Sequence, residues 1–183
     1  MASPPMDQAT IMTPSPRAQM FLIVNNVQKV KNIKNMLVSA SSFGVCEVFL
    51  VGQKKFDLQG DLAPFVAQLR CPVTRLASLA ECKAHCAARG IRVVGVEIME
   101  NAQSILDEPF VGDTAFMMGN EGSGMNAAQV AICDDFVIIP QYGGGTASLN
   151  VTVAASIIMN SFAVWAQIPI APPLSVDAAP AST

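Results

Sequence analysis

Charged residues are scarce in this sequence. Only 14% of its 183 residues are Asp, Glu, Lys or Arg, whereas 51% are apolar. This balance excludes a disordered chain and predicts one domain with a well-buried core. Long apolar runs are also absent, because those around Val137 and Ile157 are interrupted by polar residues, and no membrane-spanning helix is expected. The first residues lack a basic start followed by an apolar block and contain few arginines. Neither a secretory signal nor a transit peptide is therefore expected.

The five cysteines form an odd count in a chain without a secretory signal. We therefore interpret them as reduced thiols of an intracellular protein, cytoplasmic or nuclear, with an organelle also open. Cys82, His85 and Cys86 are close in sequence, but a closed zinc site needs four ligands and only Cys71 is near them. No metal site is predicted, and the favoured interpretation is two buried thiols beside a surface histidine.

The net charge of −3 at first argues against a nucleic-acid partner, but the charge is unevenly distributed. Residues 29–55 contain five lysines and one acid, a net of +4, so the remainder carries −7. A basic patch on an acidic body is able to bind phosphates with salt-sensitive affinity, although a solvated lysine face is the alternative interpretation. The candidate RNA-binding residues are Lys29, Lys31, Lys34, Lys54 and Lys55.

Apolar runs alternate with helical periodicity in the body of the chain, between proline-rich segments that predict flexible tails over residues 1–18 and 167–183. Helices and strands of this kind in alternation predict an α/β domain over residues 19–166, with a mainly parallel sheet and helices on both faces. The expected strands are Met20–Val24, Glu47–Val51, 92–97, 115–118 and 136–139. The expected helices are 32–43, 62–69, Leu79–Ala88 and 147–165.

The expected helix over residues 32–43 has one anomalous residue. Its apolar residues fall on one stripe at helical spacing, with lysine, asparagine and serine on the other side. Val38 lies on that polar side, where the pattern predicts a polar residue.

Two loops of unusual composition follow expected strands. The first reads GNEGSG over residues 119–124, and the second reads PQYGGGTASLN over residues 140–150. In parallel sheets, ligands bind beyond the carboxyl ends of the strands, and glycines there allow the backbone to approach a ligand closely. Neither loop is a dinucleotide-binding or P-loop motif. A binding site is favoured over a pair of flexible turns, because two such loops follow two strands.

These loops, together with residues 25–52, resemble the three motifs of the SpoU (TrmH-like) branch of the SPOUT RNA methyltransferases. The resemblance covers residues 20–165 in the expected order. It implies that the C-terminal part of the chain forms a deep trefoil knot, which binds S-adenosylmethionine. It also implies a homodimer, with each pocket near the interface, and methyl transfer to a ribose 2′-hydroxyl of tRNA or rRNA.

The resemblance also implies roles for individual residues. Asn32, Glu121, Ser148 and Asn150 match positions that shape the catalytic geometry. A ribose hydroxyl is a poor nucleophile that must be aligned and relieved of its proton, and short polar side chains on a rigid loop suit that task. The implied cofactor-binding residues are Gly119, Asn120, Glu121, Gly122, Ile139, Gln141, Ser148 and Leu149.

The sequence departs from the family pattern at the position of the catalytic arginine, which is Val38 here. Lys34 precedes it by four residues and so shares its helix face. One hypothesis is that Lys34 supplies the missing positive charge as a catalytic residue. The competing hypothesis is a lapsed enzyme that binds RNA or cofactor without turnover, and a third is a metabolic α/β enzyme. The target RNA is not identified, and its choice rests on the basic patch, on dimer geometry or on a partner protein.

Overall fold

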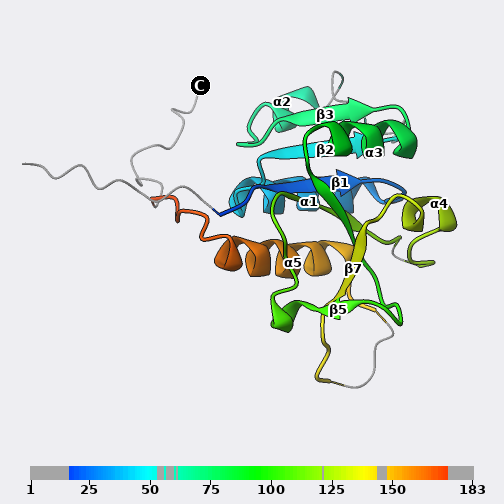
Figure 1. Cartoon of the computed structure of the whole chain (residues 1–183). Coiled ribbons are helices and arrows are strands. Elements are labelled where there is room, and N and C mark those ends of the chain that lie inside the picture. The colour runs from blue at the N-terminus through cyan, green and yellow to red at the C-terminus, as the bar shows by residue number, and fades with distance from the viewer. Residues whose placement is uncertain are drawn as a thin grey trace, which may run out of the picture.

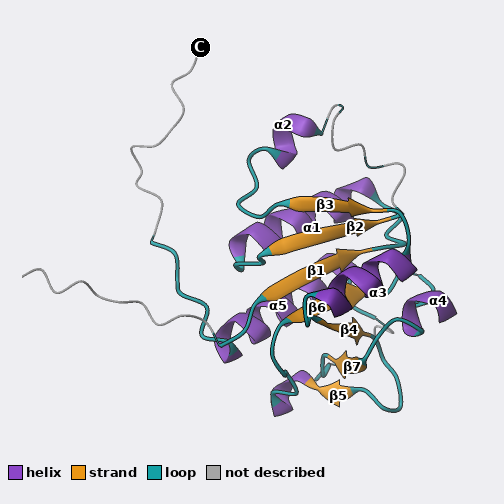
Figure 2. Ribbon diagram, turned by 45° about the horizontal axis from the view of Figure 1, so that its top comes forward, coloured by secondary structure: helices purple, strands orange, loops and turns teal. Residues whose placement is uncertain are grey.

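The structure, a computed structural model, describes residues 17–52, 56, 60, 62–120, 122–143 and 148–172. These residues form a sheet in the order β3-β2-β1-β6-β4-β7-β5, and every pair of neighbouring strands is parallel (Figures 1 and 2). The predicted parallel α/β class is therefore confirmed. The strands are β1 (Met20–Val24), β2 (Glu47–Val51), β3 (Val73–Leu76), β4 (Arg92–Val96), β5 (Gln103–Ser104), β6 (Thr114–Met118) and β7 (Asp135–Ile138).

Helices cover both faces of the sheet, as the sequence predicts. One core cluster joins the sheet to α1 and α5, and the other joins it to α3. Figure 2 shows α1 and α5 behind the sheet and α3 in front of it. The helices are α1 (Val30–Ser42), α2 (Ala63–Val66), α3 (Leu79–Ala88), α4 (Ala127–Val130), α5 (Val151–Trp165) and the short 3-10 helix η1 (Ile105–Asp107).

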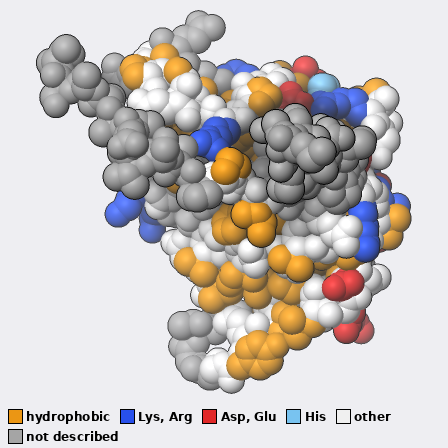
Figure 3. Space-filling view, turned by 90° about the vertical axis from the view of Figure 1, so that its left-hand side faces the viewer, with side chains coloured by type: hydrophobic (Ala, Val, Ile, Leu, Met, Phe, Trp, Pro, Cys, Tyr) orange, Lys and Arg blue, Asp and Glu red, His pale blue; other side chains and the backbone are white. Residues whose placement is uncertain are grey.

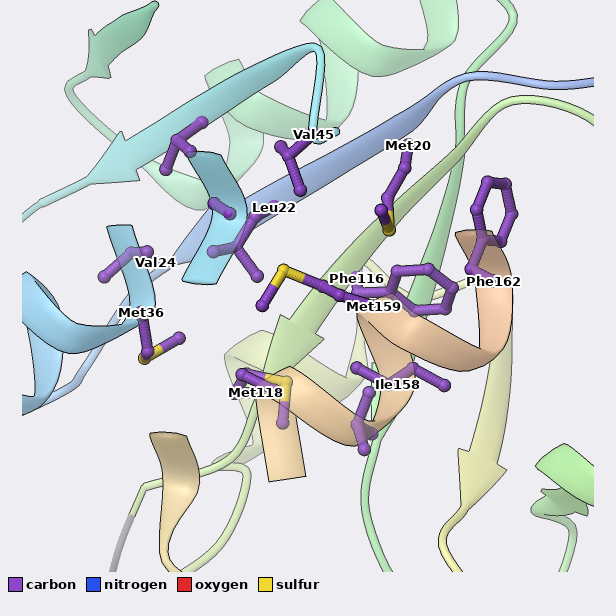
Figure 4. Close-up of a cluster of buried hydrophobic side chains, with 14 of the residues drawn as sticks. Met20, Leu22, Val24, Met36, Val45, Phe116, Met118, Ile158, Met159 and Phe162 are labelled. Atoms are coloured by element: carbon purple, nitrogen blue, oxygen red, sulfur yellow. The ribbon is translucent and has the colours of Figure 1, made fainter. Parts of the chain in front are cut away.

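Strand β1 is buried over its whole length because both of its faces are covered. Successive side chains of a strand point to opposite faces, so Met20, Leu22 and Val24 pack toward α1 and α5, whereas Phe21 and Ile23 pack toward α3. Figure 4 shows the first three of these among side chains of α1, β6 and α5. Fully burying one such side chain contributes about 1.5–3 kcal/mol.

Helix α5 packs against α1 and closes the core. It begins at Val151, because the Asn150 side chain accepts a hydrogen bond of 2.9 Å from the Thr152 N–H and caps the helix. The predicted helix over residues 147–165 was therefore too long at its start, where Ser148 to Asn150 are not helical. A hydrogen bond of 2.9 Å between the Ser39 and Ser156 hydroxyls joins the two helices.

Several smaller features differ from the sequence-based expectations. Strands β3 and β5 and helix α4 were not predicted, α2 is shorter than expected, and α1 begins two residues earlier than expected.

No helix among the described residues is long and apolar enough to cross a bilayer. Figure 3 shows apolar side chains gathered across the lower half of the face that it presents. The trefoil knot and the boundaries of the tails stay predictions.

Asp134 ties together three elements at the amino edge of the sheet. Its carboxylate accepts hydrogen bonds from Lys83 of α3, at 2.5 Å, and from the Val93 N–H of β4, at 2.8 Å. Its own N–H donates to the Val93 carbonyl at 2.7 Å. Burial alone raises the pKa of Asp134, but these two donors outweigh burial and lower it below its usual value. The ionised carboxylate therefore stabilises the alignment of β4 with β7.

We expect Asp134→Asn to lower the free energy of unfolding by about 1 kcal/mol at pH 7, since the carboxylate is a third exposed and partly screened. Because folding lowers this pKa, the contribution is present above about pH 4 and is lost as the pH falls further. Urea unfolding of the unmodified chain and of the Asp134→Asn variant at pH 7 and pH 3 measures the difference. Glu100→Gln, which removes an exposed carboxylate, is the control. A difference that is as large at pH 3 as at pH 7 contradicts this assignment.

Candidate functional site

A cavity of about 270 Å³ lies where β4, β6 and β7 end and α5 begins. It brings together the two glycine-rich loops that the sequence singled out, at the edge of the sheet where parallel folds bind ligands. Its walls combine backbone, apolar side chains and a few polar groups, as in small-molecule sites. The lining residues are Val96, Glu97, Ile98, Met118, Gly119, Asn120, Gly122, Gly124, Ile138, Ile139, Gln141, Ser148, Leu149, Val151 and Ala154.

The cavity contains every predicted cofactor-binding residue that the structure describes. These are Gly119, Asn120, Gly122, Ile139, Gln141, Ser148 and Leu149. Glu121 lies outside the described residues. Gly119 and Leu149 are far apart in sequence yet line the same cavity in the folded chain. Their role in binding a cofactor stays a prediction.

The first loop is held in a tight turn by the side chain of Asn120. Its carboxamide oxygen accepts hydrogen bonds from the N–H groups of Gly122, at 3.0 Å, and Ser123, at 3.2 Å. Its carboxamide nitrogen donates to the Asn26 carbonyl at 2.8 Å. Asn120 and Gly124 also exchange two backbone hydrogen bonds, of 2.9 and 3.1 Å. One side chain therefore shapes the loop and attaches it to the segment after β1.

Glu97, the residue after β4, holds the same loop from the other side. Its carboxylate accepts hydrogen bonds from the Met125 N–H at 2.8 Å and from the Ile98 N–H at 3.0 Å. Sequence reasoning missed Glu97 as a site residue, although it placed this residue at the end of an expected strand. The rule that ligands bind beyond strand ends makes such a residue a candidate, but it does not identify the loop that Glu97 contacts.

Two glycines make room for the Glu97 carboxylate. A β-carbon at position 119 or at position 124 would lie 2.6 Å from its Oε2 atom, so a side chain at either position would force the carboxylate to move. Gly124 also has φ +66°, a conformation that favours glycine. The cavity is thus lined by bare backbone where the two loops meet. This lining suits a partly apolar ligand that is recognised largely by N–H and C=O groups.

The candidate catalytic residues are not all gathered in this cavity. Ser148 lines it, and Asn150 caps α5 beside it. Asn32 is buried in α1, and Lys34 packs over the Phe65 ring at 5.6 Å from its centroid. Neither of these two residues of α1 lines the cavity.

Val38 is 49% exposed on the outer face of α1, which confirms its position on the polar side of this helix. It does not line the cavity either. The predicted basic patch is partly visible in the structure. Lys29 and Lys31 are exposed around the start of α1 and Lys34 is half-buried, whereas Lys54 and Lys55 lie outside the described residues.

Cys82 and Cys86 are fully buried under the opposite face of the sheet, as predicted. A hydrogen bond with Cys86 and burial together raise the pKa of Cys82 far above its usual range, so this thiol stays protonated. His85 is half-buried, not on the surface, and packs edge-on against Phe49 with ring centroids 5.0 Å apart. Cys71 belongs to the core cluster on the other face of the sheet.

The model of the SpoU rRNA methylase family matches residues 19–160, and the chain belongs to this family. The chain is 26% identical over 138 residues to the tRNA (guanosine(18)-2′-O)-methyltransferase of Escherichia coli K12, covering 74% of this chain and 59% of that protein. It is 29% identical over 147 residues to the 23S rRNA (guanosine-2′-O-)-methyltransferase RlmB of Coxiella burnetii, covering 76% and 56%. The chain therefore spans less than two thirds of the length of these relatives.

Solved structures share the fold. The SpoU methyltransferase AviRb from Streptomyces viridochromogenes, in complex with the cofactor AdoMet, superposes with a TM-score of 0.69 at 23% identity, over 88% of this chain and 62% of AviRb. The TrmH/SpoU tRNA modifying enzyme of A. aeolicus superposes with a TM-score of 0.64 at 20% identity, over 82% and 75%. At these identities the likeness establishes the fold alone.

We expect Gly119→Ala to lower the free energy of unfolding by about 2 kcal/mol, because the new methyl group displaces the Glu97 carboxylate. In a Glu97→Ala background the same substitution is expected to cost at least about 1 kcal/mol less. Chemical denaturation of the two single variants and the double variant measures this coupling. Gly143→Ala is the control, since no described atom lies within 4 Å of a β-carbon there. Strictly additive effects contradict the packing of Gly119 against Glu97.

Proposed function

We propose that this chain binds S-adenosylmethionine and transfers its methyl group to a ribose 2′-hydroxyl of tRNA or rRNA. One observation carries the proposal. The described residues that the family resemblance assigns to the cofactor come from three separate segments of the chain and line one cavity. The family membership and the names of the two curated relatives support the same reaction. An RNA substrate makes the inside of the cell the expected location.

The cavity suits a cofactor with both polar and apolar parts. The backbone around Gly119 offers hydrogen-bonding groups, and Leu149 and Ile139 offer apolar contacts. S-adenosylmethionine, when bound, supplies an electrophilic methyl group on a positively charged sulfur. The Glu97 carboxylate lines the cavity and favours a cationic ligand over a neutral one. Ser148 lies on the same wall, where a short hydroxyl is able to orient a ribose.

The structure also bears on which residue would remove the proton of the 2′-hydroxyl. Lys34 does not line the cavity of its own chain. The hypothesis that Lys34 replaces the family arginine therefore requires the lysine to act across the interface of a homodimer, near the pocket of the partner. The exposed Val38 favours the competing hypothesis, a lapsed enzyme that binds RNA or cofactor without turnover.

Methyl transfer from labelled S-adenosylmethionine to total cellular RNA tests the proposal and separates these hypotheses. We expect label in RNA with the unmodified chain. We expect Lys34→Ala to lower kcat by about 10²–10⁴-fold, the typical loss when a proton-transfer group is removed. Lys29→Ala, at an exposed cation next to the same helix, is the matched control and is expected to raise KM for RNA with little change in kcat.

Three other outcomes change the conclusion. Methyl transfer that survives Lys34→Ala unchanged removes this lysine from the reaction. Label that appears only after Val38→Arg means that the natural chain is a lapsed enzyme. The absence of S-adenosylmethionine binding, measured by calorimetry, overturns the proposed function as a whole.

We also propose that the active form is a homodimer that joins through α1 and α5. Val153 and Ile157 lie on one face of α5, four residues apart, and are 48% and 37% exposed. Val38 of α1 is 49% exposed, and the hydrogen bond between Ser39 and Ser156 brings these helices together next to it. Apolar side chains that gather on a surface are typical of an interface. A second copy of this chain would cover them.

We expect Ile157→Glu to convert a dimer into a monomer, because the interface would bury an unpaired charge. Sedimentation velocity of the unmodified chain and the variant measures this change. Leu106→Glu, at a 63% exposed position on η1, is the control that should leave the dimer intact. An unmodified chain that sediments as a monomer at all concentrations contradicts the homodimer.

A further inference from the structure

A second cavity, of about 750 Å³, opens where β1 and β2 end. Four carboxamide side chains line it: Asn25, Asn26, Gln28 and Asn126. We name it the amide pocket after these residues. Its remaining described walls are apolar, and none of the described lining residues carries an ionisable side chain. The described lining of the amide pocket therefore suits a ligand with apolar faces and hydrogen-bonding groups at its edge.

A nucleobase has this chemistry. Each carboxamide presents a donor and an acceptor side by side, and such a pair is able to read two neighbouring groups at the edge of a base. The faces of a base are apolar and pack against apolar side chains, such as the exposed Val30 and the partly exposed Leu79 of this pocket. A metabolite without a planar polar edge would use few of these groups.

Two of the carboxamides are held in place before any ligand binds. The Asn25 side chain donates to the Val51 carbonyl at 3.0 Å, which fixes the orientation of its amide. The Asn126 side chain accepts from the Gln129 N–H at 3.0 Å, and the Gln129 side chain accepts from the Asn126 N–H at 3.1 Å. Groups that are already ordered lose little entropy when they bind, so the amide pocket is organised for recognition.

The amide pocket shares a wall with the cofactor cavity. The loop over residues 118–126 contributes Gly119 and Asn120 to the cavity at its start and Asn126 to the amide pocket at its end. Asn120 connects the two sites. It lines the cofactor cavity, and its side chain donates a hydrogen bond to the carbonyl of Asn26, which lines the amide pocket. Lys29 directly follows Gln28 and is exposed, so a cation that is able to contact a phosphate lies next to a residue of the amide pocket.

We infer that the amide pocket binds one nucleobase of the RNA substrate, close to the nucleotide whose ribose is methylated. This inference rests on the proposed function and extends it, since it assigns target recognition to this chain's own residues. Carboxamides bind a base edge with directional hydrogen bonds, whereas lysines contact phosphates without reading sequence. The amide pocket would therefore contribute base preference, and the lysines would contribute affinity.

Calorimetry with the full chain tests the inference, with AMP, GMP, CMP and UMP as probes and ribose 5-phosphate as the probe without a base. Excess S-adenosylhomocysteine is present throughout, so that adenine does not enter the cofactor cavity. We expect at least one nucleotide to bind about tenfold tighter than ribose 5-phosphate, since base contacts of this kind contribute more than 1 kcal/mol.

The variants probe the carboxamides directly. Gln28→Ala removes an exposed amide, and Asn126→Asp keeps a residue that caps α4 while replacing the amide nitrogen by oxygen. We expect each to weaken binding of the preferred nucleotide at least about fivefold. Gln103→Ala, an exposed glutamine on the edge strand β5, is the matched control and should change nothing. Equal affinity for ribose 5-phosphate and all four nucleotides, or unchanged binding by both variants, overturns the inference.

The methyl-transfer assay distinguishes failure of this inference from failure of the proposed function. RNA that is labelled by a chain without base-selective nucleotide binding refutes the amide pocket alone and leaves methyl transfer intact. Base-selective binding that depends on Gln28, in a chain that binds no S-adenosylmethionine, refutes the proposed function and leaves a base-binding site. Label in RNA that falls with Gln28→Ala supports both.

Discussion

The contact between the Glu97 carboxylate and the loop over residues 118–126 is the constraint on which both cavities depend. A carboxylate at the end of β4 is able to bind the Met125 N–H only because positions 119 and 124 have no side chains in its way. With that contact made, the loop turns back on itself through Asn120. The same asparagine then attaches the loop to Asn26 and so to the segment that follows β1.

This constraint works because the sheet brings the right strands together. The order β1-β6-β4-β7 places the end of β6 beside the ends of β1 and β4. A parallel sheet gathers all carboxyl ends at one edge, so loops that are distant in sequence meet there without long connections. Asn150 caps α5 at this edge, and the helix then runs back along α1, where its buried face fills the core. The helix that closes the hydrophobic core therefore also positions Ser148 and Leu149 at the cavity that the first loop lines.

Much of this arrangement follows from the sequence. The five strands with apolar runs and the two loops were predictable, because burial on both faces and clusters of glycine leave clear patterns. Strand β3 was missed since it lies at the sheet edge and carries Thr74 and Arg75, which interrupt the apolar pattern. Glu97 was missed for a different reason. An acid at a strand end usually points to solvent, and only the space left by Gly119 and Gly124 reveals its partner.

The residues proposed to bind the cofactor and those proposed to activate the hydroxyl lie in different parts of the structure. The cofactor cavity is built from β4, β6, β7 and the start of α5, whereas Lys34 and Val38 belong to α1 and lie outside it. Replacing an arginine by Val38 leaves the buried stripe of α1 intact, because that position is exposed and contributes little to the core. A change at position 38 is therefore able to leave the fold and the cavity intact. For this reason the cavity supports cofactor binding more directly than it supports turnover.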